Sequence, residues 1–587
     1  MSRPVTGKQS VGEWRVRRPN GDIYVYERTT EYDAETRKGR TVSTRLLGKI
    51  RAGESEIVAT RPRRRPSSDA SGTFRRHAGA MEILDWVGRA SNIDEDLRAA
   101  FPDGGDAAKI MSIARYMVAA ERQSLTELEE WQVMHRTPYE HPIREDTYSD
   151  LFMSVGRNEA GIQEFFRNRC SHLDQADVIA FDSTSVSTYS ERQIQARDGF
   201  NKEGDGLKVI KLLTLYSVKS RQPIAFASLP GNIADVVTVR NALSQVSCLN
   251  LANPLLVVDN GYYSERNIAR LCHARMRFLC LASKTTSWIR KIVDEKMEEC
   301  QNVNNTCAFD METRGCTALV AHEMRIEDGG KTFSRRLRVH VFHNADRALR
   351  ERSDLTRTVL GLRDRVRRGS ELSDHDRELA SRYLRTSRRK GVISCTIRKD
   401  AIDDSSRYFG YFVIVTNAKV DASEALRLYR LREKIEEMFA IYKGDADGRR
   451  PRTWHPDRLR GRQLAQFVAL GYRAFLVNRL EAVRDALRDY LDLEASLRKQ
   501  AGDSEDSRSE LRRLFAENGI TSQEGKLRGS LLSWMTGRPL HKLLSWFECM
   551  EETHVKTLAG QRRWSTEATK RDELFLRLLM ENHTEKI

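Results

Sequence analysis

ADVIAFDSTS, residues 176–185, joins a short apolar run directly to an aspartate, Asp182. An apolar run of this length, without alternating polar residues, is typical of a strand buried on both faces of a sheet. A second run of this kind, NPLLVV at 253–258, ends directly before Asp259. The two runs predict buried, neighbouring strands of an α/β sheet, each with a carboxylate at its carboxyl end, where open α/β sheets place their sites.

Other apolar segments extend this sheet on both sides of the two aspartates. A meander of three strands is predicted first, followed by a helix, a strand, a helix and a strand, which together indicate a mixed α/β sheet. The helices are expected at about 236–246 and from Ser264 onward. The remaining strands are LKVIKLLTLYSV at 207–218, QPIAFASL at 222–229 and RMRFLCLAS at 275–283.

A less regular segment follows between about residues 285 and 417. It contains a charged helical pair at about 346–385, and we interpret it as an insertion rather than an independent core. Four strands are predicted in it, namely TALVAHEMRIE, RLRVHVFH, GVISCTI and YFGYFVIVT.

YRLREKIEEMFAIYK, residues 429–443, reads as part of one amphipathic helix. At about 100° per residue, Tyr429, Arg432, Glu436 and Lys443 fall within one narrow arc beside the apolar face. The helix is expected to begin at Asp421, with Glu424 three residues later in a capping-box arrangement.

The polar arc has two interpretations. Arg432 and Glu436 could form an exposed i,i+4 pair that contributes a few tenths of a kcal/mol. Alternatively, Glu436 could be the third carboxylate of a site that includes Asp182 and Asp259, because a buried carboxylate is costly unless it is paired or binds a cation. Neither aspartate has an adjacent Arg or Lys in the sequence to neutralise it, which favours the second interpretation.

Three carboxylates without a histidine cluster favour Mg²⁺ or Mn²⁺ over zinc. Two such ions about 4 Å apart can activate a water or a 3′-hydroxyl and stabilise the leaving oxygen of a phosphodiester. Arg432 and Lys443 would then bind phosphate oxygens, and Tyr429 could donate its hydroxyl to another.

Length, composition and charge restrict the class of protein further. A chain of 587 residues is too long for one core and predicts about two to four domains. Neither a membrane span nor a secretory signal is found, so a cytoplasmic protein is expected. The nine cysteines include no C-x-x-C pair, which indicates neither a disulfide framework nor a zinc site. The formal charge of +16 suits a polyanion such as nucleic acid.

The spacing Y-x2-R-x3-E-x6-K resembles the signature of DDE transposases of bacterial insertion sequences, in the branch that cuts DNA through a hairpin intermediate. Further segments stand in the order of that family: FDSTSVS around Asp182, PGNIAD at 230–235, VVDNGYYSERN around Asp259 and RLRGRQLAQFVAL after the signature. The resemblance covers roughly residues 10–480 in organisation and is strongest over 178–470.

The resemblance implies an RNase H-like α/β core with a mostly β insertion, flanked by a small N-terminal sheet and helical N- and C-terminal regions. Asp182, Asp259 and Glu436 would be catalytic ligands of two Mg²⁺ ions, for which Mn²⁺ could substitute. Tyr429 and the two basic residues of the signature, Arg432 and Lys443, would contact the end phosphate.

The expected domains follow from the change of pattern along the chain together with this resemblance. They are a β-rich N-terminal domain (1–60), a basic linker (61–77), a helical DNA-binding region (78–170), the first part of the core (171–284), the insertion domain (285–417), the second part of the core (418–493) and a helical C-terminal region that could form a dimer (494–587).

Two DNA contacts have alternatives. The linker arginines Arg63, Arg64 and Arg65 could follow phosphates or could simply be solvated. Trp288 could stack on a flipped base in the hairpin step, although a core tryptophan is the favoured interpretation.

The resulting hypothesis is a cut-and-paste DNA transposase that acts near the bacterial nucleoid. It would bind the terminal inverted repeats of its own element, pair two ends in a homodimer or larger synapse, and join them to target DNA. The alternatives are an RNase H-like nuclease or resolvase that does not join strands, and a catalytically silent DNA-binding protein derived from a transposase.

Overall fold

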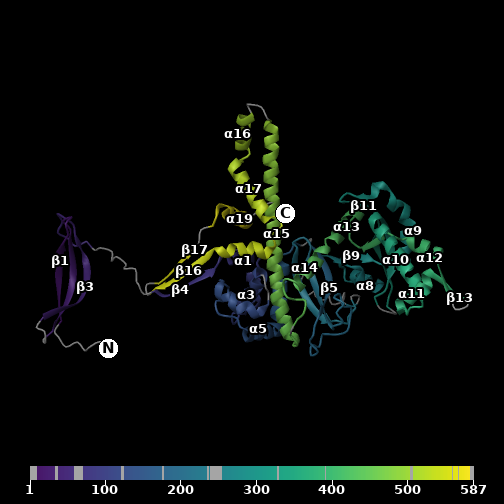
Figure 1. Cartoon of the computed structure of the whole chain (residues 1–587), viewed down its shortest axis with the longest axis horizontal. Coiled ribbons are helices and arrows are strands. Elements are labelled where there is room, and N and C mark those ends of the chain that lie inside the picture. The colour runs from purple at the N-terminus through teal and green to yellow at the C-terminus, as the bar shows by residue number, and fades with distance from the viewer. Residues whose placement is uncertain are drawn as a thin grey trace. The chain divides into compact units, whose positions relative to one another are not determined.

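A computed structural model of the chain is shown in Figure 1. It describes residues 9–33, 38–58, 70–120, 124–174, 177–234, 237, 254–326, 330–389, 392–451, 453–502, 507–557, 560–565 and 568–581. The chain forms two units. The N-terminal unit comprises Met1–Phe74 with Thr553–Trp564, and the main unit comprises Arg75–Glu552 with Ser565–Ile587.

The N-terminal unit contains an antiparallel sheet with the strand order β1-β2-β3. Its cross-strand pairs include Trp14 opposite Tyr26, and the guanidinium of Arg28 lies 5.3 Å from the Trp14 ring centroid. Such aromatic pairs contribute to the stability of a small sheet. The strands are β1 (Gln9–Arg17), β2 (Ile23–Asp33) and β3 (Lys38–Ile50).

A second three-stranded sheet has the order β17-β16-β4. Its strands are β4 (Ala70–His77), β16 (Glu551–Thr557) and β17 (Gly560–Ser565). The prediction of a linker over 61–77 is therefore wrong for its second half, and the C-terminal region is not purely helical. The pairing of β4 with a strand more than 400 residues later leaves no local signal in the sequence.

The main unit is built on a mixed sheet of nine strands in the order β10-β11-β12-β15-β9-β8-β5-β6-β7, which confirms the predicted mixed α/β sheet. Every residue of β5, β6 and β8 is buried, as expected for strands covered on both faces. The strands are β5 (Val178–Ser187), β6 (Val209–Ser217), β7 (Gln222–Pro230), β8 (Leu255–Val258), β9 (Arg277–Ala282), β10 (Thr306–Cys307), β11 (Asp310–Met324), β12 (Phe333–Asn344) and β15 (Tyr411–Thr416).

Helices cover this sheet, and the longest of them, α15 (Pro456–Ala501), contacts α3, α5 and α17 along its length (Figure 1). None of the helices in the described part of the chain has the length and apolar composition needed to cross a bilayer. The others before the insertion are α1 (Gly79–Ala90), α2 (Ile93–Ala100), α3 (Asp106–Ala119), α4 (Leu128–Met134), α5 (Glu145–Arg157), α6 (Glu159–Ser171) and α8 (Glu265–His273), and the insertion opens with α9 (Ser287–Gln301).

The segment after the insertion is helical up to the hairpin of β16 and β17. It forms α13 (Ala422–Arg430), α14 (Glu433–Lys443), α15, α16 (Ser507–Glu517), α17 (Ser522–Met535), α18 (Leu540–Trp546) and, after the hairpin, α19 (Lys570–Met580). Single 3₁₀ turns stand at Leu125–Glu127, Asn260–Tyr262, Val303–Asn305 and Phe547–Cys549.

The insertion is divided between the large sheet and a small module. Strands β10, β11, β12 and β15 extend the sheet beyond β9. Between β12 and β15, the elements α10 (Ala345–Arg368), α11 (Asp374–Tyr383), β13 (Leu384–Arg389), β14 (Val392–Ile397) and α12 (Lys399–Ser406) enclose a separate cluster of Val359, Leu362, Tyr383, Leu384 and Cys395. The insertion therefore has a small core of its own, contrary to the prediction. On the long, charged helix α10 only Val359 and Leu362 are buried, three residues apart, so this core left little sign in the sequence.

His340 on β12 links the neighbouring strands and makes the stability of the extended sheet depend on pH. Its side chain is 0 % exposed, and Nδ1 lies 2.9 Å from the Thr317 hydroxyl on β11. Burial, and secondarily the charge of Arg338, lowers the pKa of His340 to about 4. The unfolded chain, with an ordinary histidine pKa of about 6.5, binds the proton first as the pH falls.

We expect this linkage to remove about 3 kcal/mol of unfolding free energy as the pH falls from about 6.5 to 4, with the full stability present above about 6.5. His340→Gln flattens that slope in denaturant titrations at several pH values. The control is His375→Gln, because His375 is exposed on α11. Parallel slopes for the wild type and His340→Gln would contradict the assignment.

Candidate functional site

The register of two parallel strands brings Asp182 and Asp259 together. β5 pairs with β8 from Val178 opposite Leu255 to Phe181 opposite Val258, so each aspartate is the next residue after the last pair. Asp182 is not at the end of its strand as predicted, because β5 continues to Ser187 by pairing with β6. It lies where parallel pairing with β8 stops, which is the position that faces Asp259.

The signature segment forms two helices rather than the single helix predicted. α13 ends at Arg430 and α14 begins at Glu433, with Arg432 as its N-cap residue. At the break, the Arg432 amide donates to the Tyr429 carbonyl at 3.0 Å and the Ile435 amide donates to the Arg432 carbonyl at 2.9 Å. These tight i→i+3 turns replace the α-helical ladder. The helix start at Asp421 is confirmed, since its side chain accepts from the Glu424 amide at 2.8 Å.

Three carboxylates converge on the guanidinium of Arg432. Its Nη1 lies 2.8 Å from Asp182 Oδ2, and its Nη2 lies 3.5 Å from Asp259 Oδ2 and 2.9 Å from Glu436 Oε1. Arg432 is only 7 % exposed. The i,i+4 pair with Glu436 is thus present, but it is one part of a four-residue cluster built from β5, the end of β8 and α14.

Two tyrosine hydroxyls complete the cluster. Tyr429 Oη donates to Asp259 Oδ1 at 2.7 Å, and the Arg432 guanidinium carbon lies 5.6 Å from the Tyr429 ring centroid. Tyr262 Oη donates to Asp182 Oδ1 at 3.4 Å. Tyr262 was not predicted as a site residue, although its place three residues after Asp259 offered a signal.

Burial and charge determine the protonation of the cluster. Burial raises the pKa of Asp182 to about 6, and the opposing charge of Arg432 limits that rise. Burial also raises the pKa of Tyr429, and the charge of Asp259 adds to this effect, so the phenol is a donor. Although burial disfavours its charge, Asp259 and the other acids around it raise the pKa of Arg432, which is a permanent cation here.

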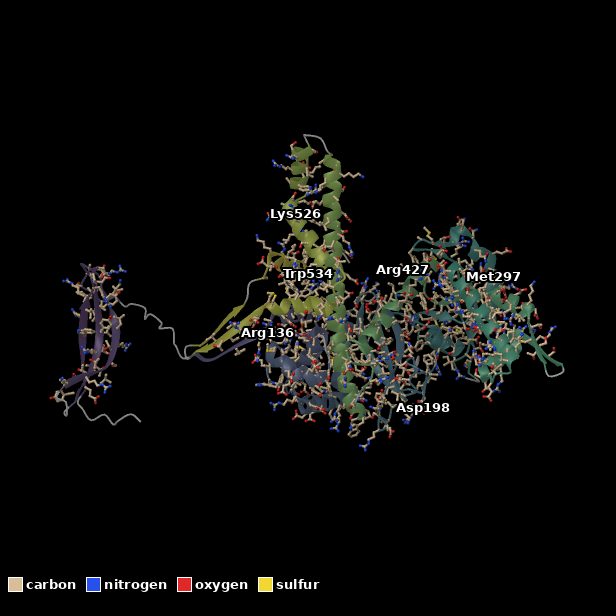
Figure 2. The ribbon with its side chains drawn as sticks, in the orientation of Figure 1. Arg136, Asp198, Met297, Arg427, Lys526 and Trp534 are labelled. Carbon is tan, nitrogen blue, oxygen red and sulfur yellow. The ribbon has the colours of Figure 1, made fainter. Side chains whose placement is uncertain are left out.

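Two basic residues of the signature helices, Arg427 and Lys443, form ion pairs away from the carboxylate cluster. Arg427, labelled in Figure 2, forms an exposed i,i+3 pair with Glu424 at 2.7 Å and has no part in the cluster. Lys443 lies farther along α14, where its amine is 3.1 Å from Glu203 Oε1 on the connection between β5 and β6. Glu203 is a second residue that the sequence did not single out.

The remaining predicted contacts lie apart from the carboxylates. Trp288, in the first turn of α9, is partly buried against the main core and stacks on His322 with a centroid distance of 4.1 Å. Arg63, Arg64 and Arg65 lie outside the described residues, as does all of the helix expected at about 236–246 except Val237.

A cation site is suggested by the chemistry of this donor set. Within the described residues, no group of three or more His, Cys, Asp or Glu side chains is arranged to hold a metal ion. The carboxylates of Asp182, Asp259 and Glu436 instead surround one positive charge, that of Arg432. The three side chains therefore supply the oxygen donors that a metal cation needs. In this structure the guanidinium of Arg432 occupies the position between them.

A transposase DDE domain model matches residues 174–470, which is half of the chain. The match includes both aspartates and all four residues of the signature. The chain belongs to this family.

The protein is accordingly a DDE-type DNA transposase, and enzymes of this kind act with divalent metal ions. No curated protein matches the chain. Among solved structures, it is similar to a piggyBac transposase synaptic complex with hairpin DNA, at 10% identity and a TM-score of 0.33, over 80% of this chain and 82% of that chain. At that score, the likeness is too distant to add to the family assignment.

Proposed function

We propose that this transposase moves an insertion sequence by cut-and-paste transposition, with Asp182, Asp259 and Glu436 as its catalytic carboxylates. The observation that supports this most directly is the convergence of the three side chains, from β5, β8 and α14, on one buried cation. Carboxylates that only capped strands or paired on a helix surface would have no reason to meet around Arg432.

Asp182, Asp259 and Glu436 would hold two Mg²⁺ ions, for which Mn²⁺ could substitute. Bound there, the ions would activate the attacking water or 3′-hydroxyl and stabilise the leaving oxygen. The three side chains supply only oxygen donors, which matches the preference of these ions. Arg432 must withdraw from the carboxylates for this site to form, because its guanidinium takes the shared position.

Arg432 would then bind a phosphate of the DNA. Arginine binds phosphate oxygens through two parallel N–H donors, and a phosphate beside the carboxylates would offer such a partner. Tyr429 and Lys443 would contact the same end phosphate. For Trp288, stacking on a flipped base in the hairpin step remains an alternative to its role in the core, where it contacts His322.

The other parts of the chain would form the catalytic core, bind the DNA ends and pair the subunits. Strands β5 to β9 of the large sheet with the α13–α15 helices would be the RNase H-like core, and β10, β11, β12 and β15 would belong to the insertion. The other predicted domain boundaries are kept, apart from the second half of the linker. The N-terminal sheet, the linker arginines and the α1–α6 region would bind the terminal inverted repeats. Two ends would be paired in a homodimer or larger synapse, with the C-terminal helices as the dimer contact, in the bacterial cytoplasm near the nucleoid.

Strand joining tests this proposal. Purified protein is incubated with Mg²⁺, DNA that carries the inverted repeats flanking its own gene, and a supercoiled target plasmid. We expect hairpin-ended intermediates followed by end DNA joined to the plasmid. Cleavage without joined products would indicate a nuclease or resolvase, and binding without cleavage would indicate a silent DNA-binding protein.

A further inference from the structure

Glu203 holds two basic side chains at once. Its Oε1 accepts from the Lys443 amine at 3.1 Å, and its Oε2 accepts from Arg449 Nε at 3.1 Å and Nη2 at 2.8 Å. Glu203 lies in the connection between β5 and β6, whereas Lys443 ends α14 and Arg449 follows it. One carboxylate thus takes the positions that the oxygens of a phosphate would take between a lysine and an arginine fork.

The next acid of the same turn repeats the pattern with the next arginine. Asp205 Oδ2 lies 3.0 Å from Arg450 Nη2, and the Arg450 guanidinium carbon lies 4.9 Å from the Tyr189 ring centroid. The acidic turn, defined here as residues 203–206, therefore faces a basic segment made of Lys443, Arg449 and Arg450.

The acidic turn does not depend on these ion pairs for its shape. The Asn201 side chain donates to Asp205 Oδ1 at 2.6 Å and to the Leu207 carbonyl at 3.1 Å, and it accepts from the Glu203 amide at 2.9 Å. Gly204 and Gly206 have φ values of +65° and +71°, which set the bends of the backbone. A turn fixed in this way can release the Glu203 carboxylate without unfolding.

The basic segment is accessible at Arg449. The Arg449 side chain is 60% exposed, whereas the side chains of Lys443 and Glu203 are mostly buried beside it. Lys443 belongs to the same polar arc as Glu436, so a DNA strand that passes the catalytic carboxylates would continue over Lys443 and Arg449. The Arg449 arm of this ion pair contributes little to folding, because solvent screens its charges.

We propose that Lys443 and Arg449 form a binding subsite for a DNA backbone phosphate, and that Glu203 occupies this subsite until DNA displaces it. This inference rests on the proposed function, since it places the DNA strand along α14. It adds Arg449 as a DNA ligand and gives Glu203 the role of an internal competitor. Free basic side chains would otherwise bind any polyanion.

Glu203→Gln tests the competitor. Binding of a fluorescein-labelled duplex of about 30 base pairs and arbitrary sequence is measured by anisotropy in EDTA. We expect Glu203→Gln to bind about 3- to 10-fold more tightly than wild type, because the carboxylate no longer competes for two cations. Glu191→Gln is the matched control, since Glu191 is exposed in the same connection and makes no ion pair with any described residue.

Arg449→Gln tests the subsite separately. We expect it to weaken duplex binding by at least about 3-fold in the wild type and to cancel most of the gain in the Glu203→Gln background. If Arg449 served only to fasten the acidic turn, Arg449→Gln would leave the affinity unchanged or raise it. Equal gains in Glu203→Gln and Glu191→Gln would likewise overturn the proposal, since they would reflect net charge alone.

Acylation of Lys443 gives a local measurement that does not depend on other DNA contacts of the chain. An amine-reactive reagent should modify Lys443 faster in Glu203→Gln than in wild type, and the duplex should protect it in both, with Lys434 as the internal reference. Absence of protection by DNA would overturn the subsite. Because these assays contain no metal and measure no cleavage, they can succeed or fail independently of the catalytic assignment of Asp182, Asp259 and Glu436.

Discussion

Asp182→Asn and Glu436→Gln should each lower the rate of DNA cleavage in Mg²⁺ by about 10³-fold or more, which corresponds to about 4 kcal/mol of transition-state stabilisation. Each substitution keeps the shape of the side chain but removes one of the negative charges that the metal ions require. The rate is measured on end-containing DNA under single-turnover conditions.

Asp198→Asn is the matched control for this experiment. Asp198, labelled in Figure 2, is exposed on the connection between β5 and β6 and is not among the carboxylates that contact Arg432, so its variant should cleave at the wild-type rate. The catalytic variants should keep their affinity for the same DNA in EDTA, which separates loss of chemistry from loss of folding. Wild-type cleavage by either catalytic variant would refute the assignment.

Arg432→Gln should produce the second large effect, on stability rather than on rate. It removes the cation that neutralises the nearly buried Asp182 carboxylate. The carboxylates of Asp259 and Glu436, which share the same guanidinium, then remain nearby without a counterion. Breaking a buried ion pair by removing one partner typically costs about 3 kcal/mol, and the partial exposure of Asp259 and Glu436 places the expected loss at about 2 to 3 kcal/mol. Denaturant unfolding in EDTA measures this loss.

Divalent ions should reverse that loss. With the guanidinium gone, Mn²⁺ can neutralise the three carboxylates without competition, so it should raise the unfolding free energy of Arg432→Gln more than that of wild type. Arg427→Gln is the control, because Arg427 makes an exposed pair on the preceding helix, and its variant should stay within about 0.5 kcal/mol of wild type. Equal stability of the two variants in EDTA, or an equal response to Mn²⁺, would argue against the counterion role.

The strands that hold the site could be predicted from the sequence, whereas most contacts between its side chains could not. The apolar runs before Asp182 and Asp259 predicted two buried strands, because a strand covered on both faces can tolerate few polar residues. That Asp182 lies in mid-strand could not be read from STSVS, because those polar residues join β5 only through the ladder with β6. The family resemblance supplied the link from these two strands to Glu436.

The features that could not be predicted depend on interactions between segments far apart in the sequence. The break between α13 and α14 is invisible in the helical periodicity, since Leu431 and Arg432 are ordinary helix formers. The Arg432 contacts that accompany it reach Asp182, 250 residues away. Glu203 and β4 were missed for the same reason, because each finds its partners on segments more than 200 residues later in the chain.

The small module that interrupts the sheet has its two ends joined by a hydrogen bond. β12 runs to Asn344, β15 starts at Tyr411 opposite His343, and the Asn344 amide donates to the Gly410 carbonyl at 3.0 Å. The residues between them leave and re-enter the sheet at one point and enclose their own core of five side chains. Such a segment can lengthen, shrink or be exchanged for a short turn while the strands that carry the carboxylates keep their register. Diversification of the enzyme can therefore proceed there without disturbing its chemistry.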